Sequence, residues 1–125
     1  MFRFKKQEYL LFALCWTHLM FYACTIPGTE VPEISFNFFI GLDKLVHMLL
    51  FMCFFLTWSF TAYYRSRLFW VLCLLGIAYG FLIEFYQFYF VDGRGFEIAD
   101  VVADASGCVL GYFLRPFFQR FVVSN

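Results

Sequence analysis

Eight polar side chains of the kinds that bind charged ligands recur in three stretches of an otherwise apolar chain. They are Asp43, Lys44, His47, Glu84, Gln87, Arg94, Asp100 and Asp104. Within each stretch most are three or four residues apart, which places them on one face of a helix. Lysine and arginine pair with phosphate or carboxylate, carboxylate oxygens suit Mg²⁺ or Ca²⁺, and an imidazole beside carboxylates can act as a general acid or base. These residue types indicate either a pocket for a charged head group or a site of acid–base chemistry.

The composition of the whole chain defines the surroundings of these side chains. Of the 125 residues, 63% are hydrophobic, 26% are aromatic and only 14% are charged, and 21 are Phe. A soluble domain carries about 25% charged residues, and a small one needs a polar surface. The net charge of zero gives no overall attraction to a phosphate backbone. The composition excludes a soluble globule, a disordered chain and a nucleic-acid-binding protein, and it favours an integral membrane protein.

Four apolar runs are long enough to cross a membrane, for which about 17–25 residues are needed. The runs are 9–29, 45–64, 68–91 and 98–114. Only the third and fourth contain charged residues, which are Glu84, Asp100 and Asp104. The expected fold is an all-α membrane protein, a four-transmembrane-helix bundle that forms a single domain over residues 1–125. The expected helices span about 8–25, 43–64, 68–91 and 98–115.

Lysine and arginine mark alternate ends of these expected helices. Seven of the nine lie in the N-terminal tail, between the second and third helices, or at the C-terminal end of the fourth helix. Because cytoplasmic segments are enriched in these residues, we expect both termini in the cytoplasm. The second helix then begins, the third ends and the fourth begins at the outer face. All eight polar side chains are therefore expected in the outer leaflet.

Glycines continue the polar stripes of the last two helices. Gly76-x-x-x-Gly80 precedes the polar pair of the third helix, and Gly107-x-x-x-Gly111 follows that of the fourth. This spacing lets helices approach closely, and it predicts that the third and fourth helices pack face to face below a polar pocket. Two simpler roles remain open: the glycines form a plain packing seam, and the polar side chains pair with one another to stabilise the bundle.

Taken in order, these motifs resemble the VanZ-like family of small bacterial membrane proteins. The resemblance covers roughly residues 10–115. Its elements are Asp43-Lys44-x-x-His47, Glu84-x-x-Gln87, Arg94, and Asp100-x-x-x-Asp104-x-x-Gly107-x-x-x-Gly111. The chain departs from the family at Asp104, where Asn is usual, and at Phe51, where Tyr is frequent. The resemblance implies a multi-pass protein of the bacterial cytoplasmic (inner) membrane. The founding member is associated with resistance to teicoplanin, a lipid-tailed glycopeptide, which implies a role in the cell envelope.

Three functions are compatible with this pattern. The first is binding of a lipid-linked or amphiphilic ligand by the eight residues, among membrane lipids; a glycopeptide such as teicoplanin or a cell-wall lipid precursor would be the partner. The second is an intramembrane enzyme acting on a lipid-linked phosphate or head group. Its catalytic residues would be His47, Glu84, Asp100 and Asp104, with a divalent cation on the three carboxylates as cofactor. The third is a small transporter, which is disfavoured because the inner halves of the expected helices lack such polar groups.

Overall fold

The computed structural model describes residues 5–27, 29, 42–61 and 66–122, and every regular element within these ranges is helical. The elements are α1 (Lys6–Cys24), α2 (Leu42–Thr61), the short 3₁₀ helix η2 (Ser66–Leu68), α3 (Phe69–Phe90) and α4 (Ile98–Val122). The expected all-α fold with four long helices is confirmed. The limits of the first three long helices differ from the expected ones by one to three residues.

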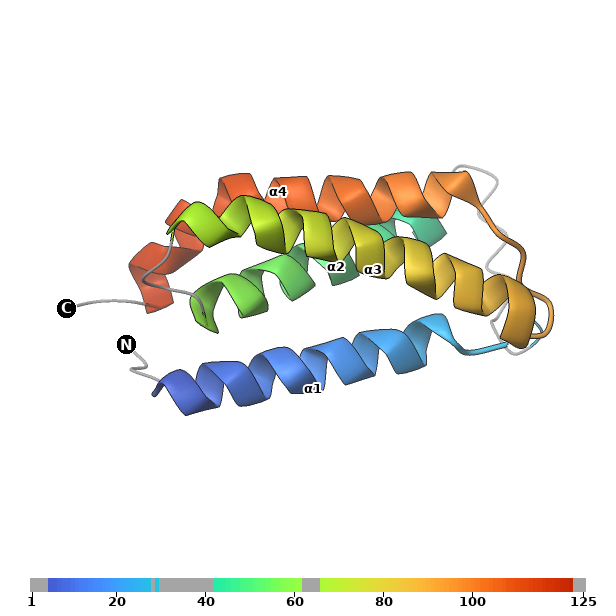
Figure 1. Ribbon diagram of the computed structural model, residues 1–125, viewed down its shortest axis with the longest axis horizontal. Coiled ribbons are helices and arrows are strands. Elements are labelled where there is room, and N and C mark those ends of the chain that lie inside the picture. The colour runs from blue at the N-terminus through green and yellow to red at the C-terminus, as the bar shows by residue number, and fades with distance from the viewer. Residues whose placement is uncertain (1–4, 28, 30–41, 62–65, 123–125) are drawn as a thin grey trace.

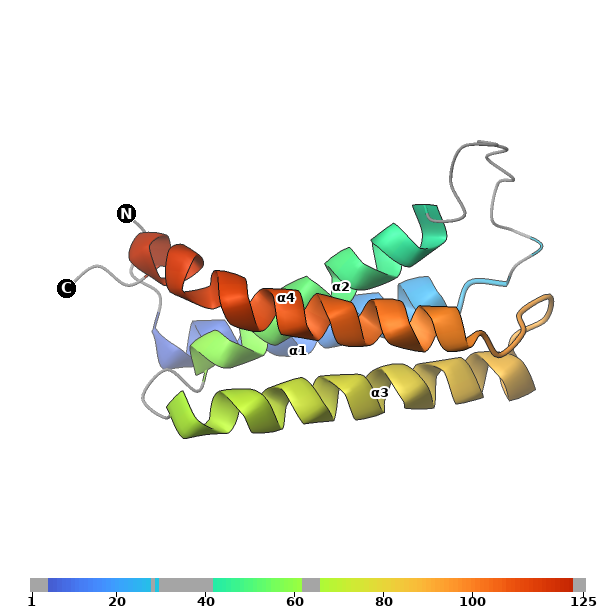
Figure 2. The ribbon, with the colours of Figure 1, turned by 90° about the horizontal axis from the view of Figure 1, so that it is seen from above.

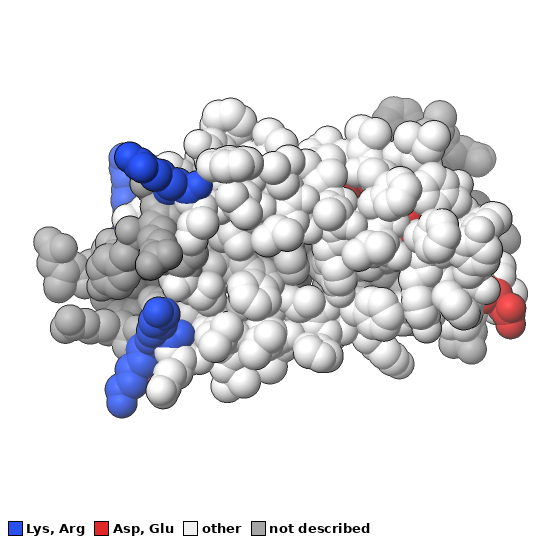
Figure 3. All heavy atoms as spheres, in the orientation of Figure 1, with Lys and Arg blue, Asp and Glu red and all other residues white. Residues whose placement is uncertain are grey.

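The helices have the length and surface of membrane spans. Three of them, α2, α3 and α4, are long and apolar enough to cross a membrane. α1 has 19 residues and includes the polar side chains Lys6, Gln7, Glu8 and His18; it is not among these three. Large apolar side chains are exposed on the sides of the bundle, as they are in proteins whose solvent is lipid. Figure 3 shows this uncharged surface between Lys and Arg at one end and acidic groups toward the other.

The four long helices run roughly along one axis (Figure 1). The most extensive contact joins α2 and α4; α3 packs on α4, α1 packs on α2, and α1 and α3 make little contact. The start of α1 and the end of α4 lie at one end of the bundle (Figures 1 and 2). The start of α2, the end of α3 and the start of α4 lie at the opposite end, which we call the polar end.

Glycines of α4 allow its close contact with α2. A Cβ atom at Gly107 would overlap the backbone carbonyl oxygen of Met48. A Cβ atom at Gly111 would lie 3.0 Å from the backbone carbonyl oxygen of Met52. Because a backbone carbonyl in a helix cannot rotate away, Gly107 is required for the observed approach of α2 and α4.

The glycines of α3 face α4 instead. A Cβ atom at Gly76 would meet the Cys108 sulfur, and one at Gly80 would lie 2.7 Å from Oδ2 of Asp104. The prediction that both glycine pairs form one seam between the third and fourth helices is therefore wrong for α4, whose glycines face α2. Residue spacing identifies the small face of a helix, but it does not identify the neighbour that packs on that face.

The fourth helix also continues beyond its expected end at residue 115. Pro116 lies inside α4, which bends near its C-terminal end (Figure 2), as expected where proline removes one backbone hydrogen bond. Arg115 donates a side-chain hydrogen bond of 2.9 Å to Gln119 across the proline, and its guanidinium lies 3.8 Å above the centre of the Phe69 ring. The first interaction links the turns before and after Pro116, and the second joins this part of α4 to the start of α3.

Candidate functional site

The connection between α3 and α4 positions Arg94 at the polar end. Gly93 adopts a left-handed backbone conformation with φ of 72°, which a residue with a side chain rarely adopts. The backbone N–H of Arg94 then donates to the Val91 carbonyl at 3.2 Å and closes the turn. The side chain of Arg94 reaches back to the carbonyl of Ile26, just after α1, with its Nε atom 3.5 Å from the oxygen. The turn thus directs the guanidinium over the space between the helix ends.

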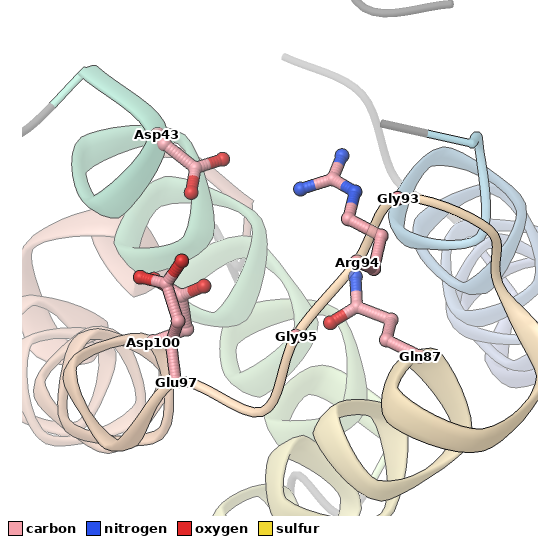
Figure 4. A pocket seen from close by; sticks show the side chains of 7 residues that line it. All are labelled: Asp43, Gln87, Gly93, Arg94, Gly95, Glu97 and Asp100. Atoms are coloured by element: carbon pink, nitrogen blue, oxygen red, sulfur yellow. The ribbon is translucent and has the colours of Figure 1, made fainter. Parts of the chain in front are cut away.

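A pocket of about 260 Å³ opens at this end of the bundle. Its lining residues are Asp43, Gln87, Gly93, Arg94, Gly95, Glu97 and Asp100. Figure 4 shows two unlike walls: Asp43, Glu97 and Asp100 on the side of α2 and α4, and Arg94 with Gln87 on the side of α3. The pocket therefore places carboxylates opposite a guanidinium.

Lys44 joins the carboxylates of the acidic wall. Its ammonium nitrogen lies 2.6 Å from Asp100 Oδ1, 2.5 Å from Glu97 Oε2 and 3.4 Å from Asp43 Oδ2. Asp100 is buried, whereas the side chains of Asp43 and Glu97 are 51% and 56% exposed. One ammonium group is shared by three carboxylates, so the wall keeps an excess of negative charge.

A second polar layer lies one helical turn below the pocket. It consists of His47, Glu84 and Asp104, all buried. The imidazole Nδ1 of His47 lies 2.9 Å from Asp104 Oδ1, and Glu84 Oε2 accepts a 3.2 Å hydrogen bond from the backbone N–H of Glu97. Within the described part of the chain, the remaining oxygens, Glu84 Oε1 and Asp104 Oδ2, have no hydrogen-bond partner.

Two sets of donor atoms in these layers are close enough together to hold a metal ion. One set comes from His47, Glu84 and Asp104, and the other from Asp43, His47 and Asp100; within each set the atoms lie within 4.8 Å of one another. Sequence reasoning gave the cation to Glu84, Asp100 and Asp104. The structure instead joins His47 to Glu84 and Asp104, and it leaves Asp100 beside Lys44.

The eight residues selected from the sequence all lie at the polar end, but they do not all face one space. Gln87 lines the pocket, yet its amide donates to the carbonyl of Cys24 in α1 at 2.5 Å. Sequence reasoning missed Glu97, which lines the pocket and bonds to Lys44. Glu97 lies just before α4 and three residues before Asp100. This spacing could have predicted that Glu97 and Asp100 lie on the same side of the helix. The backbone carbonyls of Cys24 and Ile26, which bond to Gln87 and Arg94, carry no signal in the sequence.

Comparison with known proteins gives a family match. No curated protein and no solved structure is significantly similar to the chain. The family model described as VanZ/LLP1 matches residues 9–119, and so it covers all four long helices nearly to their ends and the whole of the polar end described above. On this match, the chain belongs to the VanZ/LLP1 family.

Proposed function

We propose that this protein acts in the bacterial cell envelope, in the cytoplasmic membrane, by binding the head group of a lipid-linked or amphiphilic ligand at the outer face. The observation that carries the proposal is the two-sided pocket at the polar end, with carboxylates on one wall and Arg94 on the other. The pocket lies at the end of a bundle whose sides are apolar. A ligand could therefore place its polar part in the pocket and its acyl chain along the helices.

The charges of the two walls favour a ligand that carries both an anion and a cation. Among the described residues, Arg94 forms no ion pair with an acidic side chain, so its guanidinium can bind a phosphate or carboxylate. The opposite wall has three carboxylates and one ammonium group, from Lys44, and it can accept an amine. A phosphate or carboxylate group next to an ammonium group matches this arrangement.

The size of the pocket favours part of a large ligand. A volume of about 260 Å³ is at the lower limit for drug-sized molecules, whose pockets measure about 300–1,000 Å³. A lipid head group fits this space, whereas a whole glycopeptide does not. Of the partners expected from the family resemblance, the pocket therefore favours a cell-wall lipid precursor, or a charged substituent of a glycopeptide such as teicoplanin.

Photo-crosslinking with lipid probes tests the proposal. The purified chain in vesicles receives photoactivatable lipids with an anionic, a cationic or a zwitterionic head group. We expect the zwitterionic probe to label it best. Arg94→Gln should reduce that labelling at least about tenfold, since a hydrogen bond to a charged group contributes about 1.5–3 kcal/mol.

The matched control is Arg120→Gln, which removes an exposed arginine at the opposite end of α4. It should label as the wild type does. Equal labelling of the wild type and Arg94→Gln, or equal losses in both arginine variants, would contradict binding at this pocket.

An intramembrane enzyme remains the second candidate, because of one further observation. His47 and Asp104 form a buried pair at 2.9 Å directly below the pocket, an arrangement in which a carboxylate orients an imidazole for general acid–base chemistry. For an enzyme, His47→Gln would still be labelled by the lipid probe but would no longer change it chemically. If mass spectrometry finds that the lipid probe is chemically unaltered after long incubation with the wild-type protein, binding without catalysis is favoured.

A further inference from the structure

The buried layer below the pocket brings together one imidazole and two carboxylates from three different helices. His47 comes from α2, Glu84 from α3 and Asp104 from α4. Glu84 and Asp104 have no solvent-exposed surface, and His47 is 4% exposed. One donor atom of each residue lies within 4.8 Å of the other two. Three helices therefore supply their donor atoms to a single point inside the bundle.

The hydrogen bonds of this layer do not satisfy both of its carboxylates. Asp104 is bonded to His47 through Oδ1 only, and Glu84 receives one backbone hydrogen bond through Oε2. The other carboxylate oxygens, Glu84 Oε1 and Asp104 Oδ2, are buried without a partner among the described residues. A buried carboxylate with an unsatisfied oxygen is costly, particularly in a membrane. The nearby cation, Lys44, is bound to Glu97 and Asp100 instead.

We propose that His47, Glu84 and Asp104 bind one divalent transition-metal ion, for which Zn²⁺ is the probe. Two carboxylates and a neutral imidazole balance the charge of a divalent cation, and the ion would bond to the oxygens that lack partners. An imidazole ligand favours zinc and its neighbours over Mg²⁺ and Ca²⁺, which prefer oxygen alone. Three protein ligands leave a fourth position open on tetrahedral zinc.

Helical spacing connects this site to the pocket. His47 lies four residues after Asp43 on α2, and Asp104 lies four residues after Asp100 on α4. Glu84 lies three residues before Gln87 on α3, which runs in the opposite direction. Each proposed ligand is thus one turn below a residue that lines the pocket. The proposed metal layer therefore lies directly beneath the pocket.

The other set of close donor atoms, from Asp43, His47 and Asp100, is a poorer site. The ammonium nitrogen of Lys44 lies 2.6 Å from Asp100 Oδ1, where a metal ion would have to bind. Asp43 is exposed and also pairs with Lys44. The cation of this upper layer is therefore the lysine, whereas no lysine or arginine of the described residues forms an ion pair with the lower layer.

Metal binding is measured on the purified full chain in detergent, after treatment with a chelator and with Zn²⁺ alone as the ligand. Equilibrium dialysis with elemental analysis should give about one ion per chain. Glu84→Gln and Asp104→Asn keep the side-chain shapes and should each weaken binding at least about tenfold. Asp92→Asn is the matched control, because Asp92 is an exposed carboxylate of the neighbouring turn, and it should bind as the wild type does.

X-ray absorption at the zinc edge makes the test independent of the folding of any variant. The wild-type spectrum should show nitrogen and oxygen ligands with the scattering of an imidazole. A sulfur ligand would assign the ion to cysteine and overturn the proposal. Absence of stoichiometric binding would overturn it, and so would a loss in Asp100→Asn without one in Glu84→Gln. Because the probe is the metal alone, these results do not depend on the proposed head-group function.

Discussion

At the scale of single residues, the charge balance of the pocket depends on Lys44. Its ammonium group is shared by the carboxylates of Asp43, Glu97 and Asp100. Its side chain is 26% exposed, so water reduces the strength of these ion pairs but does not remove it. Without the lysine, three carboxylates would face one another at the polar end.

Lys44→Gln is expected to lower the free energy of unfolding by about 1–3 kcal/mol, since hydrogen bonds to charged groups contribute amounts of this order. The measurement is unfolding in detergent followed by circular dichroism. Lys6→Gln, at an exposed position at the start of α1, is the control and should change stability by less than about 0.5 kcal/mol. Equal stability of Lys44→Gln and the wild type would mean that the three carboxylates do not need the lysine.

At the opposite end of the bundle, the buried charge is Arg115. Its guanidinium lies 3.8 Å above the centre of the Phe69 ring, and both side chains are 7% exposed. A desolvated cation–π contact contributes about 2 kcal/mol. Sequence patterns assigned Arg115 only the role of marking the cytoplasmic end, because its contact with a ring 46 residues away depends on how α3 and α4 pack.

Phe69→Leu is expected to destabilise the protein by about 1–2 kcal/mol, because leucine keeps the site apolar but removes the aromatic ring above which the guanidinium lies. Thermal unfolding in detergent measures the effect. Phe117→Leu makes the same change at a residue of α4 that is 53% exposed and should have a smaller effect. A larger loss in Phe117→Leu would contradict a stabilising role for the contact between Arg115 and Phe69.

At the scale of helices, the sequence predicted the elements better than their neighbours. The expected limits of α1, α2 and α3 lie within three residues of the observed ones, because a helix in lipid must be about as long as the membrane is thick. The predicted end of α4 at residue 115 was wrong, because Pro116 bends the helix without ending it. The helix predicted to pack on Gly107 was also wrong: it is α2 and not α3. Residue spacing defines a face of a helix, but only the packed structure shows which neighbour contacts that face.

The candidate site shows the same limit. Spacing within helices placed Asp43 with His47, and Asp100 with Asp104, on common faces. It could not pair His47 with Asp104, which are 57 residues apart and belong to different helices. It also could not tell that Asp100 bonds to Lys44, whereas Asp104, one turn deeper, bonds to His47. Residue types and depth were thus predictable, whereas the pairs between helices were not.

The contact between α2 and α4 gives a prediction at this scale. Gly107→Ala places a methyl group against the Met48 carbonyl, and overpacking of this kind costs about 1–3 kcal/mol. Most of this range exceeds the gain of about 1 kcal/mol that alanine brings to a helix, and a backbone carbonyl cannot move aside, so we expect a net loss of stability. Gly95→Ala is the matched control, because a Cβ atom there meets nothing within 4 Å. In detergent, the free energy of unfolding of Gly107→Ala should be lower than that of Gly95→Ala. Equal values for the two variants would contradict the close packing of α2 and α4.

At the scale of the whole molecule, charge is distributed along the bundle axis. Figure 3 shows Lys and Arg at the end that holds the start of α1 and the end of α4, and acidic side chains toward the polar end. Lysine and arginine are enriched on the cytoplasmic side of membrane proteins. The distribution agrees with cytoplasmic termini and a pocket that faces outward.

Reporter fusions in a bacterial host test this orientation. Green fluorescent protein fused to the C-terminus should fluoresce, because it matures in the cytoplasm, and alkaline phosphatase at the same place should be inactive. Alkaline phosphatase inserted after Gly95, in the connection between α3 and α4, should be active. The reverse pattern would place the pocket in the cytoplasm and contradict the proposed outer-face ligand.

The backbone contact between Gly107 and α2 has a mechanical consequence. Helices in contact through their backbones cannot slide or tilt against each other without a clash, so α2 and α4 form a stiff unit. The acidic wall of the pocket is built on this unit, whereas Arg94 and Gln87 belong to α3 and the turn after it. The packing of α2 against α4 therefore fixes the spacing of the carboxylates in the acidic wall before any ligand arrives.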